Sequence, residues 1–158
     1  MRWLWITGLL FIFIVSCREG IHSEEQAIEI TGTTCPLDNG WIIEYPKPDY
    51  RVIYIPSKGI TMGSYDGNIR SISDGNVDKI EKIKGLPGYT VLVRNEDNTS
   101  AIYTNIQEKF VDVGQKIVKG QSIGILKKDE KFLYRTEFFI FDSGSKEFLD
   151  PKLFIECG

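Results

Sequence analysis

The sequence contains a single histidine, His22, among 158 residues. Catalytic zinc sites and Ser/His or Cys/His nucleophile pairs depend on imidazole, which binds metals and accepts protons near neutral pH. His22 lies in a polar, acidic stretch near the N-terminus, so we interpret it as a solvated linker residue. Because no histidine follows His22, few kinds of hydrolytic active site are possible in the rest of the chain.

The sequence also has no excess of basic over acidic residues. There are 19 lysines and arginines against 22 aspartates and glutamates, and the formal net charge is −3. Such a chain offers no positive surface to neutralise phosphates, which argues against nucleic acid as a partner. With 42% hydrophobic and 26% charged residues the composition is that of a globular protein, and the length suits one domain.

Only one long apolar run is present, and it follows Arg2. Residues 3–16 carry no charge but fall short of the roughly 20 residues of a membrane-spanning helix. A positive start and a short apolar core are typical of a secretory signal. The run ends in Ile14-Val15-Ser16-Cys17, which resembles the lipobox of bacterial lipoproteins, where the cysteine is acylated and becomes the first residue.

The lipobox resemblance implies a signal peptide over residues 1–16 and a lipidated tether over residues 17–29, with the lipid on Cys17. It places the protein in the bacterial cell envelope, anchored to a membrane and facing the periplasm or the cell exterior. Ordinary cleavage after a small residue and an uncleaved short anchor are the alternatives.

The cysteine count fits this interpretation. Three cysteines leave one unpaired in an exported protein. Lipidation of Cys17 would leave Cys35 and Cys157, at opposite ends of the remaining chain, free to pair in an oxidising compartment. We therefore predict a Cys35–Cys157 disulfide, which by the loop-entropy estimate stabilises the fold by on the order of 4 kcal/mol.

Residues 30–158 have the pattern of a series of short strands. The strand-like segments are rich in β-branched and aromatic residues, and several alternate apolar with polar positions. They are residues 28–30, 41–45, 50–55, 67–72, 89–94 and 100–104. Turn sequences such as Asp66-Gly67-Asn68 and Leu86-Pro87-Gly88 separate them. Only residues 77–84 compete as a helix, so the pattern predicts one all-β barrel or sandwich.

The strongest local signal is a glycine-rich segment, residues 111–126. Aliphatic residues flank Gly114, Gly120 and Gly124, which lets a strand turn tightly and re-enter a barrel edge where a side chain would clash. The segment resembles the hybrid motif of biotinyl and lipoyl-type barrels and of the lysostaphin-type (LytM-like) zinc endopeptidases. No lysine has the hairpin-tip setting of a biotinyl or lipoyl carrier, so we give the carrier function little weight.

The resemblance to the lysostaphin-type peptidases extends much further. Gly59–Ile69 is similar to that family's G-T-P-V-Y-A-x-x-D-G-x-V hairpin, and Gly88–Ile106 is similar to its following pair of strands. Leu149-Asp150-Pro151 stands where the family carries V-D-P. The match covers about Tyr50 to Phe154 and implies an all-β barrel-sandwich, the duplicated hybrid motif of these metallopeptidases, within residues 30–158.

The family's metal residues do not carry over. Its zinc is held by a His and an Asp four residues apart and by the second His of an H-x-H, while a further His assists the bound water. The matching positions are Asp49, Ile53, Asn105, Arg135 and Glu137. Because a catalytic zinc needs three protein ligands, we predict no catalytic residues, no metal and no cofactor, only a vestigial groove. We interpret Arg135 with Glu137 as an exposed pair rather than a groove-lining one.

These observations lead to a non-catalytic, lipid-anchored envelope domain that binds peptidoglycan peptides or a cell-wall hydrolase partner. One alternative is an active zinc endopeptidase of peptidoglycan with an unusual ligand set of Asp49, Asn105 and Glu137. Another is a structural envelope adaptor. Whether the groove is open depends on Phe138, Phe139 and Phe141, which would fill it if they pointed there.

Overall fold

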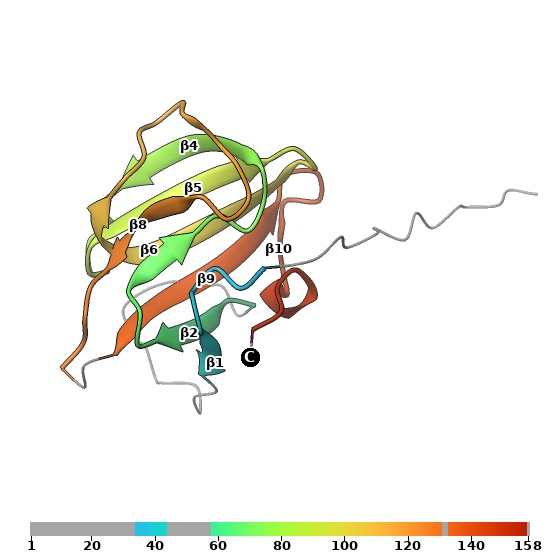
Figure 1. Cartoon of the computed structure of the whole chain (residues 1–158). Helices are drawn as coiled ribbons and strands as arrows, with labels where there is room; N and C mark the ends of the chain where they lie inside the picture. Colours follow the sequence, from blue (N-terminus) through green and yellow to red (C-terminus); the bar gives the residue numbers. More distant parts are fainter. Residues whose placement is uncertain (1–33, 44–57, 131–132, 158) are drawn as a thin grey trace, which may run out of the picture.

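The structure is a computed structural model that describes residues 34–43, 58–130 and 133–157 (Figure 1). The strands predicted at residues 28–30 and 50–55 lie outside these ranges, as do Cys17, Asp49 and Ile53. Within them the chain forms a 10-stranded sheet and one short 3-10 helix, which confirms the all-β prediction. No helix in these ranges has the length and hydropathy that a membrane crossing requires.

All strand pairings are antiparallel, and the main sheet has the order β1-β2-β9-β6-β5-β4-β7. The strands are β1 Trp41–Ile43, β2 Ile60–Ser64, β3 Asn68–Arg70, β4 Gly75–Glu81, β5 Tyr89–Asn95, β6 Thr99–Lys109, β7 Lys116–Ile117, β8 Ser122–Leu126, β9 Tyr134–Asp142 and β10 Glu147–Leu149. β10 pairs with β9, whereas β8 pairs with both β3 and β6. In Figure 1, β3 and β8 lie in front of the main sheet. The 3-10 helix η1 Pro151–Leu153 follows β10.

The core lies between the main sheet and the β3–β8 pair. Alternate residues of the central strands point into it and are fully buried, as the period of two in a strand requires. They include Val91, Val93, Ala101, Tyr103, Phe138 and Ile140 from the main sheet, with Ile69, Ile123 and Leu126 from β3 and β8. Burial of this apolar surface is the main favourable term in folding.

The glycine-rich segment behaves largely as predicted. At Gly124 a Cβ atom would lie 2.4 Å from the Glu108 carbonyl oxygen, so a side chain there would clash with β6. Gly114 and Gly120 have φ values of +83° and +79° with open space around them. At those two positions the backbone conformation, not crowding, favours glycine.

Residues 77–84, the one segment that competed as a helix in the sequence, belong mostly to β4. Val77 is buried in the core, and β4 pairs with β5 along its length with a bulge between Val77 and Lys79. Tertiary pairing therefore overrides the helical alternative.

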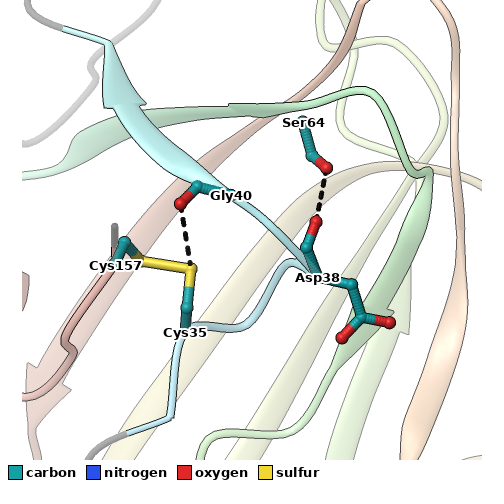
Figure 2. The surroundings of a disulfide bond; sticks show 5 residues. All are labelled: Cys35, Asp38, Gly40, Ser64 and Cys157. Carbon is teal, nitrogen blue, oxygen red and sulfur yellow. Dashed lines mark hydrogen bonds between the residues drawn. A yellow bond between two sulfur atoms is a disulfide. The ribbon is translucent and has the colours of Figure 1, made fainter.

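The disulfide between Cys35 and Cys157 is present and joins residues 122 positions apart in sequence (Figure 2). The segment after Cys35 is held against the sheet. Leu37 is 1% exposed, and Ser64 Oγ donates to the Asp38 carbonyl at 2.6 Å. The Gly40 carbonyl oxygen lies 3.8 Å from Cys35 Sγ, a contact rather than a hydrogen bond because a disulfide sulfur carries no proton.

An ion pair completes this attachment. Arg70 Nε donates to Asp38 Oδ1 at 3.0 Å and Arg70 Nη2 donates to Oδ2 at 2.8 Å, a bidentate arrangement. These hydrogen bonds lower the pKa of the Asp38 carboxyl and raise the pKa of Arg70. Both side chains remain about a third exposed, so the pair orients the segment more than it stabilises the fold.

Candidate functional site

The residues matched to the family's metal site come from two neighbouring strands, Asn105 from β6 and both Arg135 and Glu137 from β9 (Figure 1). On the other side of β9, Thr61 of β2 pairs with Glu137 and Gly63 pairs with Arg135. Directly paired residues of antiparallel strands share a face. These four therefore lie on the face of the sheet opposite the core, which we call the outer face.

Threonine side chains interrupt the regular ladder next to this site. The pairing of β6 with β9 ends at Tyr103 and Phe138. Beyond it, Thr104 Oγ1 accepts from the Glu137 N–H at 3.0 Å. Thr136 Oγ1 donates to the Thr104 carbonyl at 2.9 Å. These side-chain hydrogen bonds take the place of backbone hydrogen bonds between the strands. β6 can therefore change direction at residue 105.

Asn105 occupies that position with a φ of +61°, a left-handed conformation that asparagine tolerates better than most residues. Its Nδ2 donates to the Arg135 carbonyl at 2.6 Å, and it lies 3.4 Å from the Lys127 carbonyl. Its Oδ1 is buried and has no donor among the described residues. The amide therefore ties β6 to β9 and to the segment after β8.

Arg135 forms an ion pair with Asp129, with Nε 2.8 Å from Oδ2. The two side chains are 26% and 27% exposed. The expected exposed pair of Arg135 with Glu137 is therefore wrong in its exposure, and the ion pair seen for Arg135 is with Asp129. No sequence pattern indicates this pairing, because Asp129 belongs to the connection before β9 and reaches Arg135 only through the fold.

Glu137 is half-buried, and Thr61 Oγ1 donates to its Oε1 at 3.3 Å. Burial raises the pKa of the Glu137 carboxyl above its ordinary value, and the Thr61 hydrogen bond acts in the opposite direction. Among the described residues no lysine or arginine nitrogen lies within ion-pair distance of it. Glu137 is therefore a partly desolvated carboxylate without a compensating cation in this part of the chain.

The residues at these positions do not fit a catalytic zinc. A guanidinium donates protons and cannot ligate, and an amide is a poor substitute for imidazole, so Glu137 is the one carboxylate among the three positions that the structure describes. Across residues 34–43, 58–130 and 133–157 no group of three or more His, Cys, Asp or Glu side chains could hold a metal ion. Asp49 and Ile53, the other two positions matched to the metal site, lie outside those ranges.

The aromatic residues of β9 divide between the two faces of the sheet. Phe138 points into the core, where its ring lies 5.2 Å from that of Tyr103. Phe139 and Phe141 lie on the outer face, and both contact Phe148 of β10 edge-on, with ring centroids 6.1 and 5.2 Å away. Of the three phenylalanines on which the openness of the groove was expected to depend, Phe138 therefore points away from the face that carries Glu137.

These aromatic side chains continue into an apolar surface that sequence reasoning missed. Ile102 pairs with Phe139 and Leu92 pairs with Ile102, so both share the outer face. We call the set the apolar row: Leu92, Ile102, Phe139, Phe141 and Phe148. None of them belongs to the core cluster. The signal was the unbroken apolar stretch Phe138–Phe141, which predicts a strand covered on both faces.

A separate cavity of about 430 Å³ lies beside the disulfide and is lined by Cys35, Leu37, Asn39, Gly40 and Trp41. The Trp41 ring packs against Tyr65 at 5.2 Å. Asn105, Arg135 and Glu137, the matched residues that the structure describes, do not line this cavity, so it is distinct from the site on β6 and β9.

The antiparallel sheet, the glycine-rich crossing and the position of the site define the fold of the lysostaphin-type metallopeptidases. The sequence model of Peptidase family M23 matches residues 56–138, more than half of the chain. The protein therefore belongs to Peptidase family M23, which confirms the resemblance seen in the sequence.

Two proteins of Bacillus subtilis strain 168 are similar in sequence. Stage II sporulation protein Q is 38% identical over 88 residues, which are 54% of this chain and 30% of that protein. Stage IV sporulation protein FA is 31% identical over 96 residues, which are 60% of this chain and 34% of that protein. The matches thus span about a third of each relative.

Solved structures show the same likeness. A chain of the SpoIIQ–SpoIIIAH pore-forming complex superposes with a TM-score of 0.62 at 25% identity, covering 81% of this chain and 93% of that one. A second SpoIIIAH–SpoIIQ complex gives a TM-score of 0.61 at 25% identity, covering 78% and 100%. Lysostaphin gives 0.59 at 18% identity over 78% of this chain and 53% of that one, which supports the fold alone.

Proposed function

We propose that this protein is a non-catalytic member of family M23 that acts by binding another protein of the bacterial cell envelope. The observation that carries the proposal is the use of the former metal positions. The Asn105 amide holds the Arg135 carbonyl, and the Arg135 guanidinium holds Asp129. Both side chains are engaged in contacts within the domain rather than arranged around a metal.

The comparisons favour a protein as the partner. The structures that match at 25% identity are complexes in which SpoIIQ is assembled with another protein, SpoIIIAH. A scaffold that loses its metal ligands keeps its sheet, and the sheet still offers a surface for recognition. Peptidoglycan peptides and a cell-wall hydrolase remain within the same proposal as ligands of an envelope binding domain.

We further propose that the chain is held at a membrane by a lipid on Cys17 and that residues 17–29 act as a tether to the domain at residues 30–158. An acyl anchor would hold the domain near a membrane-embedded partner and raise its local concentration there. Mass spectrometry of the protein from its native membrane tests this, because diacylation of Cys17 and loss of residues 1–16 change the mass of the N-terminal peptide in a defined way.

The experiment for the central function combines two measurements on the purified full-length protein. The first is hydrolysis of cross-linked peptidoglycan with added zinc, with and without chelator. The second is retention of purified sacculi and of envelope proteins crosslinked to the protein in cells, each retained protein being purified and bound again alone. We expect no chelator-sensitive cleavage and direct binding to one partner.

Two results would contradict the proposal. Stoichiometric zinc with chelator-sensitive cleavage would favour the active endopeptidase with Asp49, Asn105 and Glu137 as ligands. Retention of neither sacculi nor any envelope protein would leave a structural adaptor as the better account, and a single symmetric assembly in solution would then support it.

A further inference from the structure

The connection between β4 and β5 is both basic and apolar (Figure 1). We call residues 82–89 the basic loop, and their sequence is Lys-Ile-Lys-Gly-Leu-Pro-Gly-Tyr. The chain as a whole has an acidic excess, yet this loop carries two lysines and no acidic residue, and the next acidic residue along the chain is Glu96. Positive charge is therefore concentrated locally in this loop.

The charged and apolar side chains of the basic loop face solvent. Lys82 and Lys84 are exposed, Ile83 between them is 38% exposed, and Leu86 is half-buried. Turns are usually built from Gly, Pro, Asn, Asp and Ser, so the turn itself does not require an isoleucine between two lysines. Lysines beside exposed apolar side chains are typical of a surface that enters the interfacial region of a membrane.

The basic loop is ordered by its own contacts. The Leu86 N–H donates to the Ile83 carbonyl at 3.1 Å, which closes a turn. Gly85 has a φ of +93°, which glycine adopts without strain. Lys82 Nζ lies 4.6 Å from the centre of the Tyr89 ring, a cation–π contact. Because the loop is already ordered, binding through its exposed side chains costs little further entropy.

The two lysines of the loop keep their charge available. Among the described residues no acidic side chain lies within ion-pair distance of Lys82 or Lys84. Glu81, which precedes the loop on β4, has its Oε2 2.7 Å from Lys79 Nζ and is compensated there. The loop consequently complements an anionic surface.

The tether proposed above is long enough for the loop to reach a membrane. Residues 17–33 separate the proposed lipid on Cys17 from Thr34. A chain spans at most about 3.5 Å per residue, so these residues reach up to roughly 60 Å. A domain of this length has a radius of gyration of only about 14 Å. The tether therefore allows any face of the domain to contact the membrane.

We propose that the basic loop docks on the anionic membrane surface to which the chain is tethered, with Lys82 and Lys84 at lipid phosphates and Ile83 in the interfacial region. This inference rests on the proposed function for the lipid anchor and adds the part of the domain that faces the membrane. Each lysine near an anionic leaflet strengthens binding by about fivefold, and the anchor supplies a high local concentration. The β5–β6 turn, at the other end of β5, then faces away from the membrane.

The test is hydrogen–deuterium exchange, measured by mass spectrometry on the full-length protein in lipid nanodiscs. One set of discs contains phosphatidylcholine alone, and the other contains phosphatidylcholine and phosphatidylglycerol in equal parts. We expect the amides of residues 82–88 to exchange more slowly in the anionic discs by on the order of fivefold. The amides of residues 96–98, in the β5–β6 turn, should exchange equally in both.

Variants locate the contact, each compared with itself in the two kinds of disc. Lys84→Glu replaces a cation by an anion and should abolish most of the difference between the discs. Ile83→Ser should reduce the difference, with the melting temperature recorded to show that the variant is folded. The matched control is Lys116→Glu, an exposed lysine on β7 beside the first residues of β4, which should keep the wild-type difference.

Three outcomes would overturn the inference. They are equal exchange of residues 82–88 in both discs, an unchanged difference in Lys84→Glu, and protection that requires added sacculi or the envelope partner, which would make that ligand the occupant. If the partner is retained while residues 82–88 exchange equally in both discs, the docking fails and the proposed function stands. If Cys17 carries no lipid, the proposed anchor is wrong, and the same exchange experiment on protein added to vesicles of the two compositions decides whether the loop docks.

Discussion

The two faces of the main sheet are built from the same strands, yet several of their side chains differ in burial and charge. On β9, Phe138 and Ile140 are fully buried in the core, whereas Glu137 and Phe141 on the outer face are half-buried. Because alternate residues of a strand point to opposite faces, substitutions on one face leave the other nearly untouched. A member of family M23 can therefore keep its fold while the residues at the positions matched to the metal site change.

The largest expected loss of stability comes from removing the disulfide, which lies away from the candidate site. Replacing Cys35 and Cys157 by serine opens a loop of 122 residues, and the loop-entropy estimate for this length is about 5 kcal/mol in the free energy of unfolding. Urea unfolding of the double variant measures the loss, with Cys17→Ser as the control. An unfolding free energy of the double variant equal to that of Cys17→Ser would contradict a stabilising role of the bridge.

A matched pair of truncations on β9 compares the faces directly. Phe138→Ala removes a ring that is 0% exposed in the core and should cost about 3–5 kcal/mol. Phe141→Ala removes a half-buried ring from the outer face and should cost about half as much or less. Denaturant unfolding of both variants gives the comparison. Equal losses would mean that the outer face is as much a core as the inner one.

A substitution of Tyr103 measures the contribution of a buried hydrogen bond in the core. Its hydroxyl accepts from the Ile72 N–H at 3.0 Å, and burial raises its pKa to about 12. Tyr103→Phe leaves that N–H without its acceptor and should cost about 1–3 kcal/mol. Because Tyr103 ionises first in the unfolded chain, wild-type stability should fall as pH rises from about 10 toward about 12, a slope that the variant lacks. A variant with the wild-type slope would exclude Tyr103 as its source.

The smallest change in stability is expected for Glu137→Gln. Unlike the preceding variants, this one should gain stability. Because burial raises the pKa of its carboxyl, the folded state holds this proton more tightly than the unfolded chain does. Stability from this group is fully present below the ordinary glutamate pKa and is lost as pH rises through the folded value. Glu137→Gln should therefore raise the melting temperature slightly at neutral pH and not in acid. A lowered melting temperature at neutral pH would show that the charge is already paired.

Much of the fold could be predicted from the sequence, because period-two alternation and turn residues are local signals. The segment at residues 89–94 corresponds to β5 almost residue for residue. β6 runs on to Lys109, well past the predicted end at residue 104, because its exposed polar end pairs with β8 and looks like a loop in the sequence. Residues 77–84 were ambiguous because their apolar residues, Val77, Ile80 and Ile83, recur every three residues, and only the pairing with β5 settles the structure of so short a segment.

The site could be predicted only in part. The absence of histidine from residues 30–158 led to the prediction that the positions matched to the metal site bind no metal, which is a statement about residue types. The partners that those residues acquired, Asp129 for Arg135 and backbone carbonyls for Asn105, depend on register between distant segments. The apolar row likewise required the pairing of β5, β6, β9 and β10 before its members could be seen to share a face.

The central claim is that Glu137 no longer belongs to a metal centre. Zinc content after dialysis against zinc and then buffer, measured by mass spectrometry on the full-length wild type and on Glu137→Gln, tests this most directly. The account predicts the same zinc content, well below one ion per chain, in both proteins. One zinc ion per wild-type chain that disappears in Glu137→Gln would contradict it.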